Sequence, residues 1–379
     1  MIKNILPILE KLISFKSVTP KGADAIEYVA QFLSELGFTC ETKSFGDGEE
    51  TVTNLYAILG NATPNICFAG HLDVVPPMSE NLWRFDPFKM TIQNEIVYGR
   101  GTTDMKGAVA CYLSAVTAFL EEYKKPKGSI SFLLTTDEEG EAKHGTKKML
   151  EHIKNYTPKI DFCILGEPTT KHQIGDTIKI GRRGSVNFTL KVNGKQGHVA
   201  YPEKAVNPIP VMTHILKELS DKKFDSGSRY FQQTNLEITS VDTDNTTSNV
   251  IPESVSAKFN IRFNDKYTAN DLSSEIIQII SLHAEDYDLK YSSSSAPFIQ
   301  KYSPRMQEFA KIVQKLCKIT PNIETGGGTS DARFIHSHAE VVEFGLNCDP
   351  AHKINEHTQI SDLQALHNVY YNCLVKFLK

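Results

Sequence analysis

The sequence lacks cysteine pairs, long apolar runs and an excess of positive charge. Its seven cysteines stand singly and form no CxxC pair, which argues against a cysteine-rich zinc site and fits a reducing compartment. The formal net charge is −4, so no broad positive field attracts nucleic acid or an anionic membrane. No apolar run approaches the roughly 20 residues that cross a bilayer. We therefore expect a cytoplasmic protein that binds neither nucleic acid nor a membrane.

The amino terminus also lacks the features of an export signal. Residues 1–4 begin an amphipathic segment, whereas a signal peptide needs a continuous apolar stretch. The chain has 379 residues, of which 40% are hydrophobic and 23% charged, as is ordinary for a globular protein. Because a single core rarely grows beyond about 250–300 residues, this length predicts two or more domains.

Two different patterns of apolar and polar residues follow one another along the chain. Apolar, strand-like runs alternate with helical stretches in the first part of the sequence, at 54–60, 65–70, 129–136 and 161–166. This alternation predicts an α/β domain with a largely buried sheet. Residues 181–293 instead show strands in which apolar and polar positions alternate, and they predict four antiparallel strands with two helices. The α/β texture then returns and ends in a helix near 361–378.

The simplest domain organisation is one α/β domain split by an insertion. We expect residues 1–180 and 294–379 to form the discontinuous α/β domain. Residues 181–293 form the inserted α+β domain, a lid or dimerisation domain. The run of four serines at 292–295 is expected to be a short hinge.

Candidate metal ligands stand at the ends of predicted strands or in the loops after them. Five stretches carry them: GHLDVVPP (70–77), GRGTTDMKG (99–107), TTDEEGE (135–141), LGEPT (165–169) and AHKINEHT (351–358). Ligands bind at the carboxyl ends of the strands in an open α/β sheet, so we expect a site there. Each stretch alone can be explained by a purely structural role, for instance Asp104 as a helix cap or Glu167 as part of a turn. All five structural explanations would have to be true at once, so the set as a whole favours a metal site.

The spacing within these stretches suggests how the side chains divide their work. His71 and Asp73 lie two residues apart and point the same way on an extended backbone, so Asp73 could fix the tautomer of a ligating His71. Neighbouring side chains on a strand point to opposite sides, so we expect one of Glu138 and Glu139 to bind metal and the other to face the substrate. Asp137 is left as support for the turn. Nitrogen and oxygen ligands without cysteine suit zinc, cobalt or manganese.

These motifs resemble the M20 metallopeptidase family over the whole chain, the insertion included. GHLDVVP and DEEG are similar to the family at large. Four further stretches are similar to its succinyl-diaminopimelate desuccinylases: GRRGS (181–185), QGHVAYP (196–202), GGGTSDARFI (326–335) and HKINE (352–356). The resemblance implies a zinc-exopeptidase-like catalytic domain with a central mixed sheet. It also implies a homodimer formed through the inserted domain.

The same resemblance implies two divalent metal ions per subunit, zinc with cobalt as a possible substitute. The implied ligands are a bridging Asp104, His71 with Glu167 at one metal, and Glu139 with His352 at the other.

The resemblance also implies the catalytic residues. Glu138 is the implied general base, Asp73 is counted with the catalytic residues as the partner of His71, and His198 reaches the oxyanion from the partner's inserted domain. A cis peptide bond is implied between Asp104 and Met105.

The implied reaction hydrolyses N-succinyl-LL-2,6-diaminopimelate to succinate and LL-2,6-diaminopimelate, a step of lysine and meso-diaminopimelate biosynthesis. A small molecule with three carboxylates needs cationic and hydroxyl donors, and arginine pairs with carboxylates through two parallel hydrogen bonds. The candidate substrate-binding residues are Arg182, Ser185, Tyr201, Asn249, Arg262, Gly328 and Thr329. From the sequence alone, Arg262 fits a strand arginine that faces water equally well.

Alternatives remain open at this stage. Acetylornithine deacetylase, or another M20 acyl-amino-acid deacylase or exopeptidase, would share every metal ligand but would carry GRRGS less often. A non-catalytic binding protein with a degenerate site would be expected to lack Glu138 or a ligand, and none is missing. A nucleotide-binding α/β protein would need a phosphate loop or a dinucleotide fingerprint, and the sequence has neither.

Overall fold

The computed structural model describes residues 2–379, with side chains from residue 5 onward. The chain forms two compact units. The larger comprises the residues up to Ile180, Gln300–Glu324 and Ser330–Lys379, and the smaller comprises Gly181–Ile299 and Thr325–Thr329. The smaller unit therefore runs six residues past the expected boundary at 293. It also takes in the glycine-rich segment at Thr325–Thr329, which lies within the range 294–379 expected for the other domain.

A mixed sheet forms the centre of the larger unit. Its strands lie in the order β1-β2-β6-β3-β7-β17-β8, with β16 also paired to β8. β6, β3, β7 and β17 are mutually parallel, whereas β1, β2 and β6 are joined antiparallel. The strands are β1 (Thr39–Phe45), β2 (Val52–Leu59), β3 (Asn65–His71), β6 (Ser129–Thr135), β7 (Phe162–Leu165), β8 (Thr177–Arg182), β16 (Asn322–Gly326) and β17 (Glu340–Glu343).

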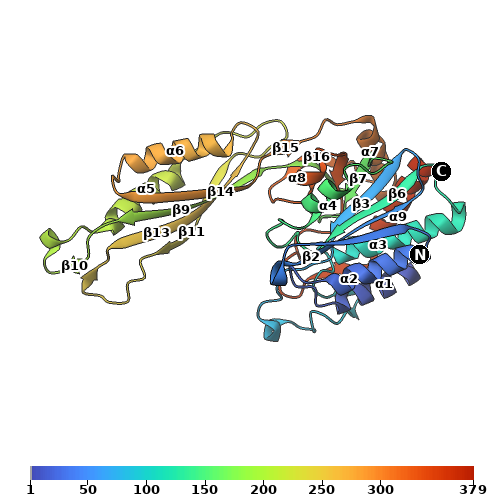
Figure 1. The fold of residues 1–379 in the computed structure, drawn as a ribbon, viewed down its shortest axis with the longest axis horizontal. Helices are drawn as coiled ribbons and strands as arrows, with labels where there is room; N and C mark the ends of the chain where they lie inside the picture. The colour runs from blue at the N-terminus through green and yellow to red at the C-terminus, as the bar shows by residue number, and fades with distance from the viewer. Residues whose placement is uncertain (1) are drawn as a thin grey trace. The chain divides into compact units, whose positions relative to one another are not determined.

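Helices cover both faces of this sheet (Figure 1). Every residue of β3, β6 and β7 is buried, as expected for parallel strands between two helical layers. The helices are α1 (Ile2–Ser14), α2 (Ala23–Glu35), α3 (Lys106–Tyr123), α4 (Thr146–Ile153), α7 (Pro304–Cys317), α8 (Ala332–Ile335) and α9 (Ile360–Leu378). α3 packs against α9 and α1. Most of its residues are buried, as its apolar sequence predicts. Within residues 2–379, no helix combines the length and the apolar character needed to cross a bilayer.

The fold gathers the metal-ligand stretches at one edge. β3, β6 and β7 are parallel, so the residues that follow them emerge at the same side of the sheet. A separate three-stranded sheet of β4 (Thr91–Gln93), β5 (Ile96–Tyr98) and β18 (His357–Gln359) joins the other two stretches. Its pairing of His357 with Tyr98 places the loop after β5 beside the loop before β18.

The smaller unit is an antiparallel sheet of order β11-β13-β9-β14 with two helices on one face (Figure 1). Its elements are β9 (Gly184–Asn193), α5 (Pro208–Asp221), β11 (Asn235–Asp242), β13 (Ser254–Phe263), α6 (Ala269–Ser281) and β14 (Tyr287–Ser295). Alternate residues of β9 and β13 are buried against the helices, as the sequence pattern predicts. Two short pairings complete the unit: β10 (Gly197–His198) with β12 (Val250–Ile251), and β15 (Phe298–Ile299) with the last residues of β8.

The expectation that the four serines form a hinge is wrong. They lie in β14, where Ser292 pairs with Asn187 and Ser293 pairs with Val186 of β9. The partner strand supplies hydrogen bonds for the serine backbone, and this tertiary pairing outweighs the weak strand preference of serine.

Candidate metal centre

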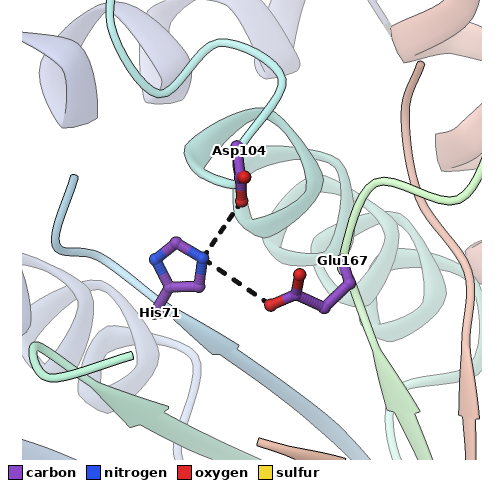
Figure 2. A group of neighbouring side chains, drawn as sticks. All are labelled: His71, Asp104 and Glu167. Atoms are coloured by element: carbon purple, nitrogen blue, oxygen red, sulfur yellow. Dashed lines mark hydrogen bonds and ion pairs between the residues drawn. The ribbon is translucent and has the colours of Figure 1, made fainter. Parts of the chain in front are cut away.

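The first cluster joins the ends of two parallel strands to the start of α3 (Figure 2). His71 is the last residue of β3 and is fully buried. Its Nε2 atom lies 3.1 Å from Asp104 Oδ1 and 3.7 Å from Glu167 Oε1. Glu167 lies two residues after the end of β7, and Asp104 stands two residues before α3. These three side chains point toward one another and could hold one metal ion.

The second cluster shares Asp104 with the first. His352 Nε2 lies 3.2 Å from Asp104 Oδ2 and 2.9 Å from Glu139 Oε1. Because Oδ1 of Asp104 faces His71 and Oδ2 faces His352, one carboxylate lies between two sets of ligands. The structure thus brings all five expected ligands into two adjoining groups. The expected cis peptide bond between Asp104 and Met105 is confirmed.

Asp73 contacts different atoms from those that the sequence suggested. Nδ1 of His71 lies 2.9 Å from the backbone carbonyl oxygen of Asp73 but 3.6 Å from its carboxylate. The carbonyl is thus the nearer acceptor that sets the tautomer of His71. The Asp73 carboxylate instead accepts the backbone N–H groups of Glu139 (3.0 Å) and Glu138 (3.4 Å). It holds the turn that carries both glutamates.

The premise that Glu138 and Glu139 lie on the end of an extended strand is wrong. β6 ends at Thr135, so the two glutamates lie in a turn and not on an extended strand. One carboxylate oxygen from each lies within 4.8 Å of the other and of a His71 nitrogen. Asp137 supports this turn, because its carboxylate accepts the N–H groups of Ala142 (3.1 Å) and His144 (2.9 Å).

Crowding of buried charge shifts the pKa values of the site in opposite directions. Burial, followed by the charge of Glu167, raises the pKa of Glu138 well above its ordinary value. Burial also opposes ionisation of Asp104, but hydrogen bonds with His352 and His71 outweigh it and lower the pKa of that carboxyl. Burial raises the pKa of Asp73 to about 6. Glu138 therefore favours a bound proton, whereas Asp104 stays ionised between two imidazoles.

The donor set fits divalent metal ions. All five side chains offer nitrogen or oxygen, which zinc, cobalt and manganese accept. Asp104, Glu139 and Glu167 bring three carboxylates into a site where their side chains are at most 11% exposed. Burial of that much negative charge is costly without cations to balance it.

The substrate-binding candidates form two groups, both in the smaller unit. The first surrounds the start of β9, where Ser185 pairs with Arg262 of β13. Asn260 links them, since its Nδ2 donates to Ser185 Oγ (3.1 Å) and its Oδ1 accepts from Arg262 Nε (3.0 Å). Arg182 donates to the backbone oxygen of Gly328 (3.3 Å), which is followed by Thr329.

The second group lies beyond the other end of β9. His198 is exposed on β10, and its Nδ1 accepts the N–H of Ala200 (3.1 Å). Its ring centroid lies 5.8 Å from that of Tyr201. The N–H of Val199 donates to the carbonyl oxygen of Asn249 (3.2 Å), which adds this third predicted residue to the group.

Sequence reasoning assigned no role to Glu356, although it ends the HKINE stretch. Its side chain is 1% exposed and accepts hydrogen bonds from the loop that carries Asp104. The position of Glu356 four residues after His352 was the available signal. The sequence could not show which backbone groups the carboxylate would meet.

Comparisons with known proteins agree with this geometry. Peptidase family M20/M25/M40 matches residues 67–376. Succinyl-diaminopimelate desuccinylase of Rickettsia bellii (strain OSU 85-389) is 54% identical over 375 residues, which cover 98% of this chain and 96% of the relative. The enzyme of the same name from Rickettsia rickettsii (strain Sheila Smith) is also 54% identical, over 98% of this chain and 99% of the relative.

Solved structures share the fold at much lower identity. The M20 family metallo-carboxypeptidase Sso-CP2 from Sulfolobus solfataricus superposes with a TM-score of 0.81 at 16% identity, covering 98% of both chains. The YXEP protein of Bacillus subtilis, described as a dinuclear metal binding peptidase from the M20 family, gives 0.70 at 14% identity. That match covers 99% of this chain and 98% of the other.

Proposed function

Because the chain belongs to peptidase family M20/M25/M40, we propose that it hydrolyses the amide bond of N-succinyl-LL-2,6-diaminopimelate. The products are succinate and LL-2,6-diaminopimelate, within lysine and meso-diaminopimelate biosynthesis. The observation that carries this choice is 54% identity, over 98% of the chain, to relatives named succinyl-diaminopimelate desuccinylase. Acetylornithine deacetylase activity is the less favoured alternative. It would use the same metal ligands, but these relatives are named succinyl-diaminopimelate desuccinylase.

We further propose that each chain binds two divalent metal ions, zinc or substituting cobalt. Asp104 would serve both ions, His71 and Glu167 would hold one of them, and Glu139 and His352 would hold the other. The two oxygens of Asp104, each facing a different histidine, support this arrangement. Bound metal ions supply polarisation of the amide carbonyl and a lowered pKa of water.

Glu138 acts as the general base and then as the general acid. Its carboxylate takes a proton from the attacking water, whose oxygen forms a bond to the succinyl carbonyl carbon. The carbon–nitrogen bond then breaks, and Glu138 returns the proton to the leaving amine nitrogen. The raised pKa of Glu138 supports this role, because the group must hold the proton between the two steps.

Arginine and hydroxyl donors bind the carboxylates of the substrate. Arg182, Ser185 and Arg262 lie together at the start of β9, with Gly328 and Thr329 beside them. Asn260 orients both Ser185 and Arg262. We assign the succinyl carboxylate to this group.

The two groups of substrate-binding residues support a homodimer through the smaller unit. β9 has ten residues, and a strand rises about 3.3 Å per residue. Ser185 near its start and His198 beyond its end therefore lie at least about 25 Å apart in one chain. One small substrate cannot touch both, so His198, Tyr201 and Asn249 act on the site of a second chain. There His198 donates to the oxygen on which negative charge develops.

A cytoplasmic location is part of the proposal. All seven cysteines are unpaired thiols, as is usual in a reducing compartment.

Initial rates of the zinc-loaded protein test the substrate. N-Succinyl-LL-2,6-diaminopimelate and N-acetylornithine are compared at equal concentration, and we expect a preference of at least about 100-fold for the succinyl compound, because a site that binds a carboxylate discriminates against ligands without it. Preference for acetylornithine would overturn the roles of Arg182, Ser185 and Arg262. Turnover of neither compound would overturn the proposed function.

A further inference from the structure

We propose that Glu356 is a positioning residue that fixes Asp104 relative to His352 and so sets the geometry of one of the two metal sites. The inference rests on the proposed metal-binding function. It concerns a carboxylate that does not belong to either cluster of ligands.

Glu356 accepts four hydrogen bonds from one short segment. Oε1 accepts the N–H groups of Thr103 (2.9 Å) and Asp104 (3.1 Å). Oε2 accepts the N–H of Gly101 (3.0 Å) and Nη1 of Arg100 (2.8 Å). The backbone of the bridging ligand is thus bonded directly to this side chain.

Further bonds join the same two segments. The N–H of Gly99 donates to the backbone oxygen of Glu356 (3.1 Å), and Arg100 donates to the oxygen of Lys353 (3.3 Å). His352 lies at the start of this second segment with φ +62°, a conformation that non-glycine residues seldom adopt. Tertiary bonds are needed to keep it there. Glu356 therefore connects the loop of Asp104 to the loop of His352.

The two metal sites depend on this connection to different degrees. His71 is the last residue of one buried parallel strand and Glu167 lies two residues after another, so the sheet holds them in place. His352 has no such support, since it lies in a loop with its side chain 53% exposed. We expect loss of the connection to weaken chiefly the site of Glu139 and His352.

An amide cannot replace this carboxylate. Each oxygen of Glu356 receives two donors, whereas a glutamine offers one acceptor and one donor end. In either orientation, the –NH₂ group of a glutamine would face two donors. Glu356→Gln therefore keeps the size of the side chain but leaves two of the four donor groups without an acceptor.

The test titrates Co²⁺ into the metal-free full chain and records visible absorption, binding isotherms and steady-state kinetics. For wild type, two ions per chain are expected. For Glu356→Gln, we expect one site to lose about 10–100-fold in affinity, the cobalt spectrum to change, and kcat to fall by a similar factor with KM nearly unchanged. Glu356→Asp keeps two acceptor oxygens and should recover part of the affinity.

Asp225→Asn is the matched control. The Asp225 carboxylate also gathers backbone N–H groups, from Gly227 and Thr234, but it lies in the smaller unit, which holds none of the clustered ligands. This control should keep the cobalt spectrum and both affinities of wild type. Native cobalt binding by Glu356→Gln, or the same losses in Asp225→Asn, would overturn the inference. So would failure of both Glu356 variants to fold. Fewer than two ions bound by wild type would instead count against the proposed function.

Discussion

Glu138 and Glu139 are neighbours in the chain, yet their carboxylates have different partners. Glu139 Oε1 lies 2.9 Å from His352 Nε2, whereas Glu138 stays outside the two clusters that share Asp104. Burial and nearby negative charge raise the pKa of Glu138, and these are the conditions that favour proton transfer over metal binding.

Glu138→Gln should abolish most turnover while both metal ions still bind. The amide cannot accept a proton, so we expect kcat to fall by about 10²–10⁴-fold. Metal content by elemental analysis should stay that of wild type. Glu141→Gln is the control, because Glu141 follows in the same turn but is exposed and pairs with Lys143. Near-normal kcat in Glu138→Gln would contradict the role of general base.

Metal uptake should release protons. Hydrogen bonds with Asp104 and then Glu139 raise the pKa of His352 to about 10. Burial alone would lower the pKa of His71, but its hydrogen bond with Asp104 and the charge of nearby carboxylates outweigh burial and raise that pKa well above its ordinary value. The His352 imidazole is therefore protonated in the metal-free chain at pH 8, the raised pKa of His71 favours a bound proton as well, and a ligating nitrogen must lose its proton. The proton on His352 stabilises the metal-free fold below its ordinary pKa, and this contribution disappears as pH rises through about 10.

Calorimetric titration of Zn²⁺ at pH 8, in two buffers of different ionisation enthalpy, counts these protons. We expect about one to two per chain, and about one fewer in His352→Gln. The apparent affinity should rise with pH up to about 10. A count of zero in wild type would show that the imidazoles are already neutral.

Single residues of the site could be predicted from the sequence only where the chain itself determines their place. His71 and Glu167 follow apolar runs that become parallel strands, so their meeting at one edge follows from the fold class. The contacts of Asp73 and Glu356 could not be predicted in the same way. Their partners are backbone N–H groups of turns that are distant in the sequence. The types of residue in those turns do not show where their backbone groups will lie.

Helices and strands, too, can be predicted from the sequence only where a local pattern determines them. The alternating pattern of β9 and β13 identifies strands with one buried face, and both form as expected. The serine run in β14 has no such pattern, and its sequence alone predicts a hinge. Pairing with β9 decides its structure instead, and a single sequence does not contain that information.

The start of α6 illustrates a local signal that the sequence does contain. Thr268 is the N-cap: its hydroxyl accepts the N–H of Asp271, whose carboxylate accepts the N–H of Thr268 in return. Thr268→Ala should destabilise the smaller unit by about 1 kcal/mol, since one N–H of the first turn loses its acceptor. Hydrogen exchange of the amides at the start of α6 would report the change.

Ser274→Ala provides the comparison on the same helix. The Ser274 hydroxyl donates to the backbone oxygen of Asn270 (2.9 Å), which already takes part in the helix. Its removal should change stability by less than about 0.5 kcal/mol. Equal exchange rates in the two variants would show that the capping box does not stabilise α6.

At the scale of the whole molecule, we propose that the active site takes groups from two chains. The arginine group lies at the start of β9 and the His198 group lies beyond its end, so the length of the strand separates them within one chain. Co-expression of two inactive variants tests this directly. One chain carries His198→Ala, the other Glu138→Gln, and different affinity tags allow the mixed dimer to be purified.

In a mixed dimer, the site on the His198→Ala chain has an intact Glu138 and receives an intact His198 from its partner. The other site lacks both groups. We therefore expect about half the wild-type turnover per dimer, although each parent dimer is nearly inactive. If His198 served the site of its own chain, every site of the mixed dimer would lack one group, and no activity would return. The parent homodimers, purified with the same tags, give the baseline against which recovery is measured.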